Sequence, residues 1–136
     1  NGGKVSGLST IMSDPDFLIA CWHKIRSNKG SMTAALTSET LDGLDIKWFN
    51  RTANSIRNGM YKFQPSKRIF ISKKDDNRSR SLIITSPRDK IIHEAMRVLL
   101  EPIFEGIFSE YSHGFRPNKS SSTALNQVRI KFGAVN

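Results

Sequence analysis

Hydrophobic residues recur at helical spacing in three stretches of the chain and gather in two shorter, β-type runs. In residues 13–30 they recur every three or four positions, which predicts a helix with one broad buried face. Ser13 or Asp14 is placed to cap this helix, and Pro15 fits its first turn. Gly30 is placed to end it. The predicted face consists of Phe17, Leu18, Cys21, Trp22 and Ile25.

A second amphipathic pattern predicts a helix over residues 46–58. Asp45 is its expected N-cap, and the pair Asn58 and Gly59 is expected to end it. The polar stretch 31–45 before it is expected to be a loop or a broken helix. The predicted buried stripe of the second helix consists of Ile46, Phe49, Ala53 and Ile56.

The period then changes from helical to strand-like. Residues 68–73 and 80–85 are short β-type runs, and the turn-rich stretch 74–79 separates them, so a β-hairpin is predicted. Asp75 and Asp76 fall in this connection. A paired-carboxylate metal site is one interpretation, but Asp is common in turns because it hydrogen-bonds its own backbone. The turn interpretation is favoured.

The strongest helical pattern runs from Ser86 to Phe104. Ser86 as N-cap with Asp89 three residues later predicts a capping box, and Pro102 is expected to kink or interrupt the helix. The adjacent His93 and Glu94 have no nucleophile or metal ligand near them in sequence, which favours a surface pair. The predicted apolar stripe consists of Ile91, Ile92, Ala95, Met96, Leu99 and Ile103.

Composition narrows the class of protein. The chain has 136 residues with 38% hydrophobic residues, which suits one domain with a core. No apolar run reaches the roughly 18 residues of a membrane span, so we expect no membrane insertion. Cys21 is the only cysteine, which excludes an internal disulfide framework. Because the chain begins at Asn1 rather than Met, we expect it to be a processed or excised piece of something longer.

Positive charge is concentrated in the middle of the chain. The net charge is +9, and the segment from Arg57 to Lys90 contains ten basic and three acidic residues. Such a patch attracts polyanions and releases their counterions on binding. Nucleic-acid binding is the favoured interpretation, and a solvated basic face or an anionic membrane surface are the alternatives.

The order of short motifs carries a family resemblance. Residues 61–125 resemble the N-terminal blocks of group II intron-encoded reverse transcriptases, also called maturases, and residues 27–44 resemble the extra block that precedes them in that family. Ser81, Thr85 and His93 depart from the usual family residues. The matching strings are Ile71-Ser72-Lys73, Arg80-Ser81-Leu82, Asp89-Lys90-Ile91-Ile92-His93, Leu100-Glu101-Pro102 and Ser112-His113-Gly114-Phe115-Arg116-Pro117.

This resemblance implies an α+β fold, the fingers subdomain of a reverse transcriptase, with N-terminal helices, a basic β-hairpin and a long following helix. Residues 1–12 are then a flexible lead-in, 13–60 the N-terminal helical extension, and 61–136 the fingers hairpin and helices leading into the palm. The Mg²⁺-binding aspartates of the palm do not occur in this sequence, so the parent would be the polymerase and this segment would be inactive alone. No catalytic or metal-binding residue is assigned here.

The resemblance also implies binding residues. Lys73 or Lys74, together with Arg80, corresponds to the lysine and arginine that hold the incoming nucleotide, because Lys acts as a point charge and Arg bridges phosphate oxygens. An open alternative for Arg116 is that it builds its turn by bonding backbone carbonyls, and Phe115 in the same turn is expected to be packed. The expected RNA-binding residues are Lys29, Lys62, Lys67, Arg68, Arg78, Arg116 and Lys119.

The implied function is that of an RNA-binding segment of a mitochondrial group II intron reverse transcriptase and maturase. The parent would act in intron splicing and in RNA-templated DNA synthesis. Its partners would be the group II intron RNA, a template, a nucleotide, and the remaining palm, thumb and maturase portions of the chain. The alternative is a detached, non-catalytic relic that serves as an RNA-binding component of a ribonucleoprotein such as a mitochondrial ribosome or splicing complex.

Overall fold

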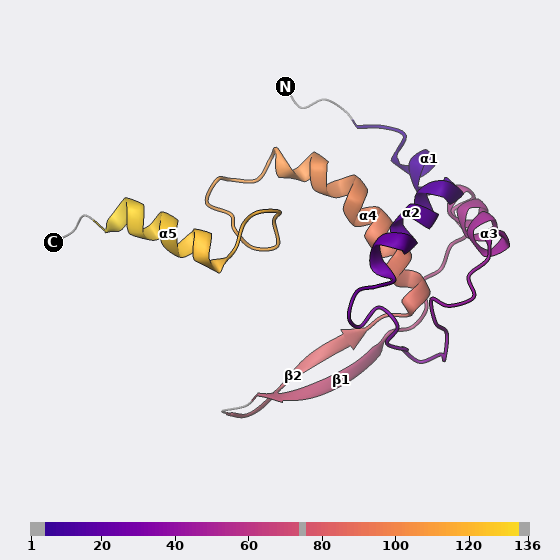
Figure 1. Cartoon of the computed structure of the whole chain (residues 1–136), viewed down its shortest axis with the longest axis horizontal. Helices are drawn as coiled ribbons and strands as arrows, with labels where there is room; N and C mark the ends of the chain where they lie inside the picture. Colours follow the sequence, from indigo (N-terminus) through magenta and orange to yellow (C-terminus); the bar gives the residue numbers. More distant parts are fainter. Residues whose placement is uncertain (1–4, 74–75, 134–136) are drawn as a thin grey trace. The chain divides into compact units, whose positions relative to one another are not determined.

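The computed structural model describes residues 5–73 and 76–133, with the side chains at positions 73 and 76–78 outside that description (Figure 1). Within these residues the chain has five helices and one two-stranded antiparallel sheet, so the predicted α+β class is confirmed. The chain divides within its longest helix into two units, Asn1–Leu99 and Leu100–Asn136.

Three helices begin the first unit: α1 (Leu8–Met12), α2 (Pro15–Ile25) and α3 (Ile46–Arg57). Asp14 caps α2 and Asp45 caps α3, each by accepting a backbone N–H within the first turn, so the capping predictions are confirmed. The short α1 lies inside the stretch expected to be a lead-in.

The core of the first unit forms where α2 and α3 meet the long helix α4 (Pro87–Glu105). The predicted face of α2 is confirmed, because Leu18, Cys21 and Ile25 are buried and Phe17 and Trp22 pack at its edge. In α3 the prediction is wrong at one end: Ile46 is 54% exposed, and Thr52 is buried instead. The remaining buried apolar residues of this cluster are Leu41, Phe49, Ala53, Ile91, Ile92 and Ala95.

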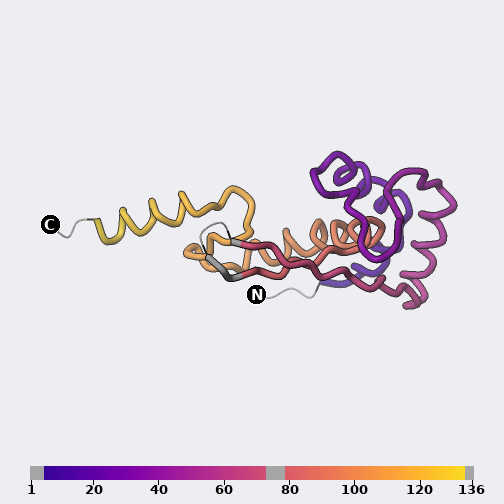
Figure 2. Tube along the Cα trace, turned by 90° about the horizontal axis from the view of Figure 1, so that it is seen from below, coloured from indigo at the N-terminus to yellow at the C-terminus, as the bar shows by residue number. Residues whose placement is uncertain are grey.

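The hairpin consists of β1 (Lys67–Lys73) and β2 (Asp76–Ile84), and it extends away from the helical core of the first unit (Figures 1 and 2). The register pairs Lys67 with Ile84 and Ser72 with Ser79, and an irregularity follows Ser72. The predicted connection 74–79 is therefore too long, because β2 begins at Asp76. Asp75 lies outside the described residues.

The helix α4 differs from its prediction at both ends. Pro102 lies inside the continuous helix, so the predicted interruption is wrong, and the alternative of a kink stays a prediction. The predicted capping box is wrong, because the carboxylate of Asp89 accepts hydrogen bonds from the Tyr61 hydroxyl and the Gln64 amide instead. Along the predicted stripe, burial is complete only at the N-terminal end, and Met96 is 40% exposed.

The second unit contains the end of α4, an irregular turn and the helix α5 (Ser121–Phe132). Ser120 caps α5 in a reciprocal capping box with Thr123. No helix among the described residues combines the length and the apolar character that crossing a membrane requires.

Candidate nucleic-acid interface

Many of the basic residues of the first unit are used to hold the fold together. The Lys90 ammonium donates to the backbone carbonyls of Gly30, Ser31 and Thr33 at 2.8, 3.1 and 3.2 Å. Partial burial lowers the pKa of Lys90. Arg57 donates to the carbonyl of Ser13. These cations are committed to protein partners and are poorly placed to bind a ligand.

A second group of cations is tied to carboxylates. Glu94, whose side chain is 12% exposed, forms ion pairs with Lys24 at 3.2 Å and Arg97 at 2.8 Å. The hydrogen bonds from Arg97 are the main reason that the pKa of Glu94 is lowered. Arg88 pairs with Glu39 at 3.3 Å. The expected surface role of Glu94 is therefore only partly right, since this carboxylate joins α2 to α4.

A third group of cations has no such partner. In the part of the chain that the structure describes, these side chains are exposed and form no hydrogen bond, ion pair or cation–π contact: Lys29, Lys62, Lys67, Arg68 and Arg80. All were predicted to bind RNA or nucleotide. Four of the five lie on the hairpin or on the segment that leads into it. The structure thus separates fold-stabilising cations from cations that are available to an anionic ligand.

The segment before the hairpin is fixed by Asp89. Its carboxylate is 2% exposed and accepts from the Tyr61 hydroxyl at 2.6 Å and from the Gln64 backbone N–H at 2.8 Å. Burial, reinforced by this hydrogen bond to Asp89, raises the pKa of Tyr61. Lys62 lies between these two anchored residues. The start of the hairpin is therefore held against the first turn of α4, which the sequence pattern did not reveal.

Strand alternation distributes the hairpin residues over two faces. Lys67 and Arg80 share one face, because Arg80 pairs with Ile71 and Ile71 lies four residues along β1 from Lys67. At roughly 3.3 Å per residue, they are about 13 Å apart along the strand. Arg68 lies on the opposite face with Phe70. We call these the Lys67 face and the Phe70 face.

The loop that carries Lys29 is anchored close to the end of β2. Lys90 holds its residues 30–33, and Glu39 receives Arg88 and the Ser86 hydroxyl, which follow β2 directly. A cavity of about 380 Å³ lies beside this loop. Its lining residues are Ile25, Asn28, Lys29, Gly30, Ser31, Lys90, His93, Glu94 and Arg97. Lys29 is thus fixed near the start of α4.

Three predicted residues are not placed as side chains. Lys74 lies outside the described residues, and Lys73 and Arg78 are described only as backbone in β1 and β2. Which lysine corresponds to the family lysine stays a prediction.

The turn of the second unit is built around Arg116. Its side chain is 9% exposed and pairs with Glu105 at 2.8 Å. It also donates to the carbonyls of Ser109 and Ser112 at 2.7 and 2.9 Å. This geometry agrees with the turn-building alternative, so we leave Arg116 out of the proposed interface. Phe115 is fully exposed with φ 58°, so its expected packing is wrong.

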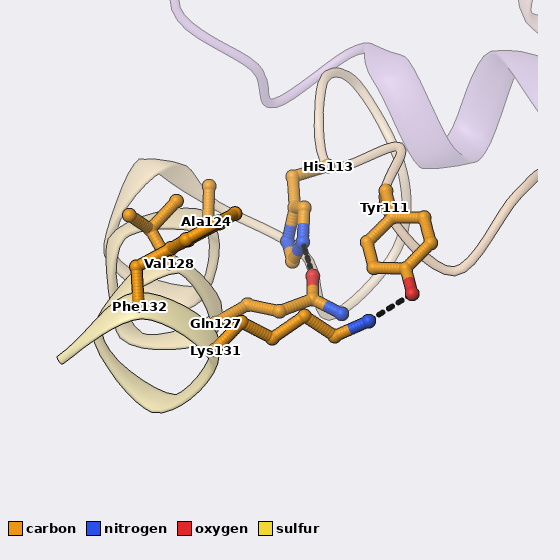
Figure 3. Close-up of a pocket in the computed structure, with 7 residues that line it drawn as sticks. All are labelled: Tyr111, His113, Ala124, Gln127, Val128, Lys131 and Phe132. Atoms are coloured by element: carbon orange, nitrogen blue, oxygen red, sulfur yellow. Dashed lines mark hydrogen bonds between the residues drawn. The ribbon is translucent and has the colours of Figure 1, made fainter. Parts of the chain in front are cut away.

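His113 joins the turn to α5 in the second unit (Figure 3). Its ring nitrogens contact the Thr123 hydroxyl at 2.8 Å and the Gln127 side-chain oxygen. A mostly apolar cavity of about 350 Å³ lies here, lined by Tyr111, His113, Ala124, Gln127, Val128, Lys131 and Phe132. Lys119 is half-buried in the same unit. The pKa of Glu105 is lowered mainly by its hydrogen bond with Arg116, and Lys119 adds a smaller electrostatic effect in the same direction.

The described residues do not fit a Mg²⁺ site. No three His, Cys, Asp or Glu side chains lie close enough together there to hold a metal ion. The best-buried carboxylate, Asp89, already accepts two hydrogen bonds. No metal-dependent step is therefore derived from these residues.

No family model matches the chain. Three of the similar proteins found by comparison carry names that refer to introns. The putative COX1/OXI3 intron 1 protein of Saccharomyces cerevisiae is 40% identical over 96% of this chain and 16% of its own length. The group II intron-encoded protein LtrA of Lactococcus lactis is 38% identical over 88% of this chain and 20% of its own length. Nuclear intron maturase 1, mitochondrial, of Arabidopsis thaliana is 42% identical over 33% of this chain and 6% of its own length. The chain thus spans one fifth or less of the length of these curated relatives.

Proposed function

The chain belongs to the family of group II intron-encoded reverse transcriptases and maturases, and we propose that it acts as the RNA-binding fingers segment of such a protein. The proposed parent assists splicing of its intron and copies RNA into DNA. The single observation that carries the proposal is a group of exposed cations on and before the hairpin that have no partner among the described residues, namely Lys62, Lys67, Arg68 and Arg80.

Physical chemistry favours RNA as the ligand of these cations. Each is a full positive charge whose field is uncompensated by a nearby carboxylate within the described residues. The net charge of +9 attracts a polyanion from a distance. Each phosphate that a cation neutralises then releases condensed counterions. The names of these relatives refer to introns, so intron RNA is the polyanion to test first.

The proposal assigns nucleotide binding to the Lys67 face. Arg80 is exposed there, and the resemblance gives the second charge to Lys73 or Lys74. Arg80 bridges phosphate oxygens, while the lysine acts as a point charge on the triphosphate. In an intact polymerase, Arg80→Ala should raise the KM for the incoming nucleotide with little change in protein stability. Normal polymerisation at low nucleotide concentration would contradict this assignment.

Location and partners follow from the same proposal. Relatives named as mitochondrial proteins favour a mitochondrial intron, although LtrA is from a bacterium. The remaining palm, thumb and maturase portions, with Mg²⁺ bound in the palm, are the proposed partners in the intact enzyme. No observation here favours the alternative of a detached relic in a ribonucleoprotein.

The direct test compares two double variants of equal charge. Lys67→Ala/Arg80→Ala removes two cations of the hairpin, and Lys47→Ala/Arg51→Ala removes two exposed cations of α3. Binding of a fluorescent group II intron RNA is measured by anisotropy at low salt. At about 1 kcal/mol for each exposed contact, the hairpin variant should bind the RNA about 30-fold more weakly than the wild-type protein does. Equal affinities for the two variants would show that binding depends on net charge alone.

A further inference from the structure

The Phe70 face of the hairpin combines features that the nucleotide assignment leaves unused. Phe70 is 69% exposed, and Ile83 is 58% exposed on the neighbouring strand. Arg68 pairs with Ile83 in register, and Phe70 pairs with Ser81, so all four side chains lie on one face. Ser72 and Ser79 continue the face toward the end of the hairpin.

This exposure is unusual for an aromatic residue on a strand. The apolar side chains of the opposite face are less exposed: Leu82 is 46% and Ile71 36% exposed, and Ile69 and Ile84 are half-buried. Among the described residues the sheet has two strands, and the hairpin extends away from the helical core of the first unit (Figures 1 and 2). The ring of Phe70 therefore presents an open flat surface beside a free guanidinium.

We propose that the Phe70 face binds single-stranded RNA by stacking a base on the Phe70 ring. Aromatic side chains beside cations form sequence-tolerant platforms for unpaired bases. Arg68 lies two residues away on the same face, at about 7 Å along the strand, where it reaches the phosphate next to a stacked base. The serine hydroxyls reach ribose or phosphate oxygens. This inference rests on the proposed RNA-binding function.

A protein partner fits this face less well. A stable protein interface takes roughly 20–30 residues on each side, whereas the Phe70 face presents six side chains. Phe70 and Arg68 are of types that are enriched in protein interfaces. Three of the six side chains, however, are serines, which are depleted there. None of the six is acidic, so the face complements a phosphate backbone.

The two faces of the hairpin then bind different parts of the RNA. The Lys67 face holds phosphates through Lys67 and Arg80, and the Phe70 face holds an unpaired base. Duplex RNA offers no free base to stack, because its bases are paired and its minor groove is read by shape and 2′-hydroxyl contacts. The face should therefore prefer single-stranded RNA over a duplex of the same length.

The test uses RNA that contains the fluorescent base 2-aminopurine, with Phe70→Leu as the variant. Leu keeps an apolar side chain on the strand but removes the ring. We expect wild-type protein to quench 2-aminopurine in single-stranded RNA, and Phe70→Leu to lose the quenching and to bind about 5- to 100-fold more weakly. Affinity for duplex RNA should change less than twofold. Phe70→Trp should retain both stacking and affinity.

Phe132→Leu is the matched control, because Phe132 is also 69% exposed but lies on α5. It should leave quenching and affinity unchanged. If Phe70→Leu binds single strands like wild type, the stacking inference is overturned while RNA binding stands. If wild-type protein binds no RNA, the proposed function fails with it. If Phe70→Leu instead abolishes a concentration-dependent dimer and leaves RNA affinity unchanged, the face is a protein contact.

Discussion

The buried Asp89 carboxylate should determine how firmly the start of the hairpin is held. It accepts a hydrogen bond from the Tyr61 hydroxyl at 2.6 Å and one from the Gln64 N–H at 2.8 Å. A hydrogen bond to a charged group contributes about 1.5–3 kcal/mol. Tyr61→Phe removes one such bond and should lower the free energy of unfolding by about that amount. Asp89→Ala orphans both donors and should cost about 3–6 kcal/mol.

Urea denaturation followed by tryptophan fluorescence measures this loss, because both tryptophans, Trp22 and Trp48, lie in the first unit. Hydrogen exchange at the Gln64 amide gives a local readout. In Asp89→Asn, exchange at this amide should accelerate relative to wild type, and by a larger factor than exchange at the amides of α2.

Tyr111→Phe is the matched control for this experiment, because Tyr111 is 55% exposed in the second unit and its hydroxyl accepts a hydrogen bond from the exposed Lys131 ammonium. As an exposed substitution it should change stability by less than about 0.5 kcal/mol. If Tyr61→Phe is as mild as Tyr111→Phe, the carboxylate does not hold the segment before the hairpin and the reasoning is refuted.

Three further predictions concern other contacts. Arg116→Lys should destabilise the turn of the second unit, because Arg116 uses one nitrogen of its planar guanidinium for the carbonyls of Ser109 and Ser112 and another for Glu105, a spread that a single ammonium does not reproduce; faster amide exchange at residues 109–116 would measure this, and unchanged exchange would refute it. Ile91→Ala should cost about 2–5 kcal/mol in urea denaturation, since Ile91 is fully buried; a loss below 1 kcal/mol would contradict the core assignment. Arg97 and Lys24 lower the pKa of Glu94 in the folded protein below its ordinary value of 4.5, so their ion pairs with Glu94 stabilise the fold above pH 4.5. This stabilisation is lost as the pH falls through the pKa that Glu94 has in the folded protein. Glu94→Gln should therefore be less stable than wild type at pH 7 and equal to it at pH 2, and a constant difference across this range would exclude the linkage.

Local signals in the sequence were sufficient for most of the helices. The caps Asp14 and Asp45 and the face of α2 follow from residues within a few positions of one another, and the structure agrees with each. The hairpin was predicted from two β-type runs and the turn-rich stretch between them, but the predicted connection is longer than the observed one. Two of these turn-forming residues, Asp76 and Ser79, join β2 because they pair with Lys73 and Ser72 of β1, and such pairing satisfies backbone groups.

Contacts between distant residues could not be read from the pattern. Asp89 has a local partner in Ser86 by spacing, yet its carboxylate is taken by residues 25 and 28 positions away. Arg116 had two open roles, and only the folded turn brings Glu105 close enough to engage it. Identical charges in the sequence therefore divide into fold-stabilising and available cations only once the tertiary contacts are known.

If the available cations of the hairpin bind RNA phosphates, as proposed, the affinity for RNA must depend on salt through these cations. The most direct measurement is the slope of log binding constant against log salt concentration for a single-stranded intron RNA. Wild type should have a steeper slope than Lys67→Ala/Arg80→Ala by about 1.4, which corresponds to two phosphate contacts on a single strand. Lys47→Ala/Arg51→Ala should keep the wild-type slope. Equal slopes in all three proteins would contradict the account.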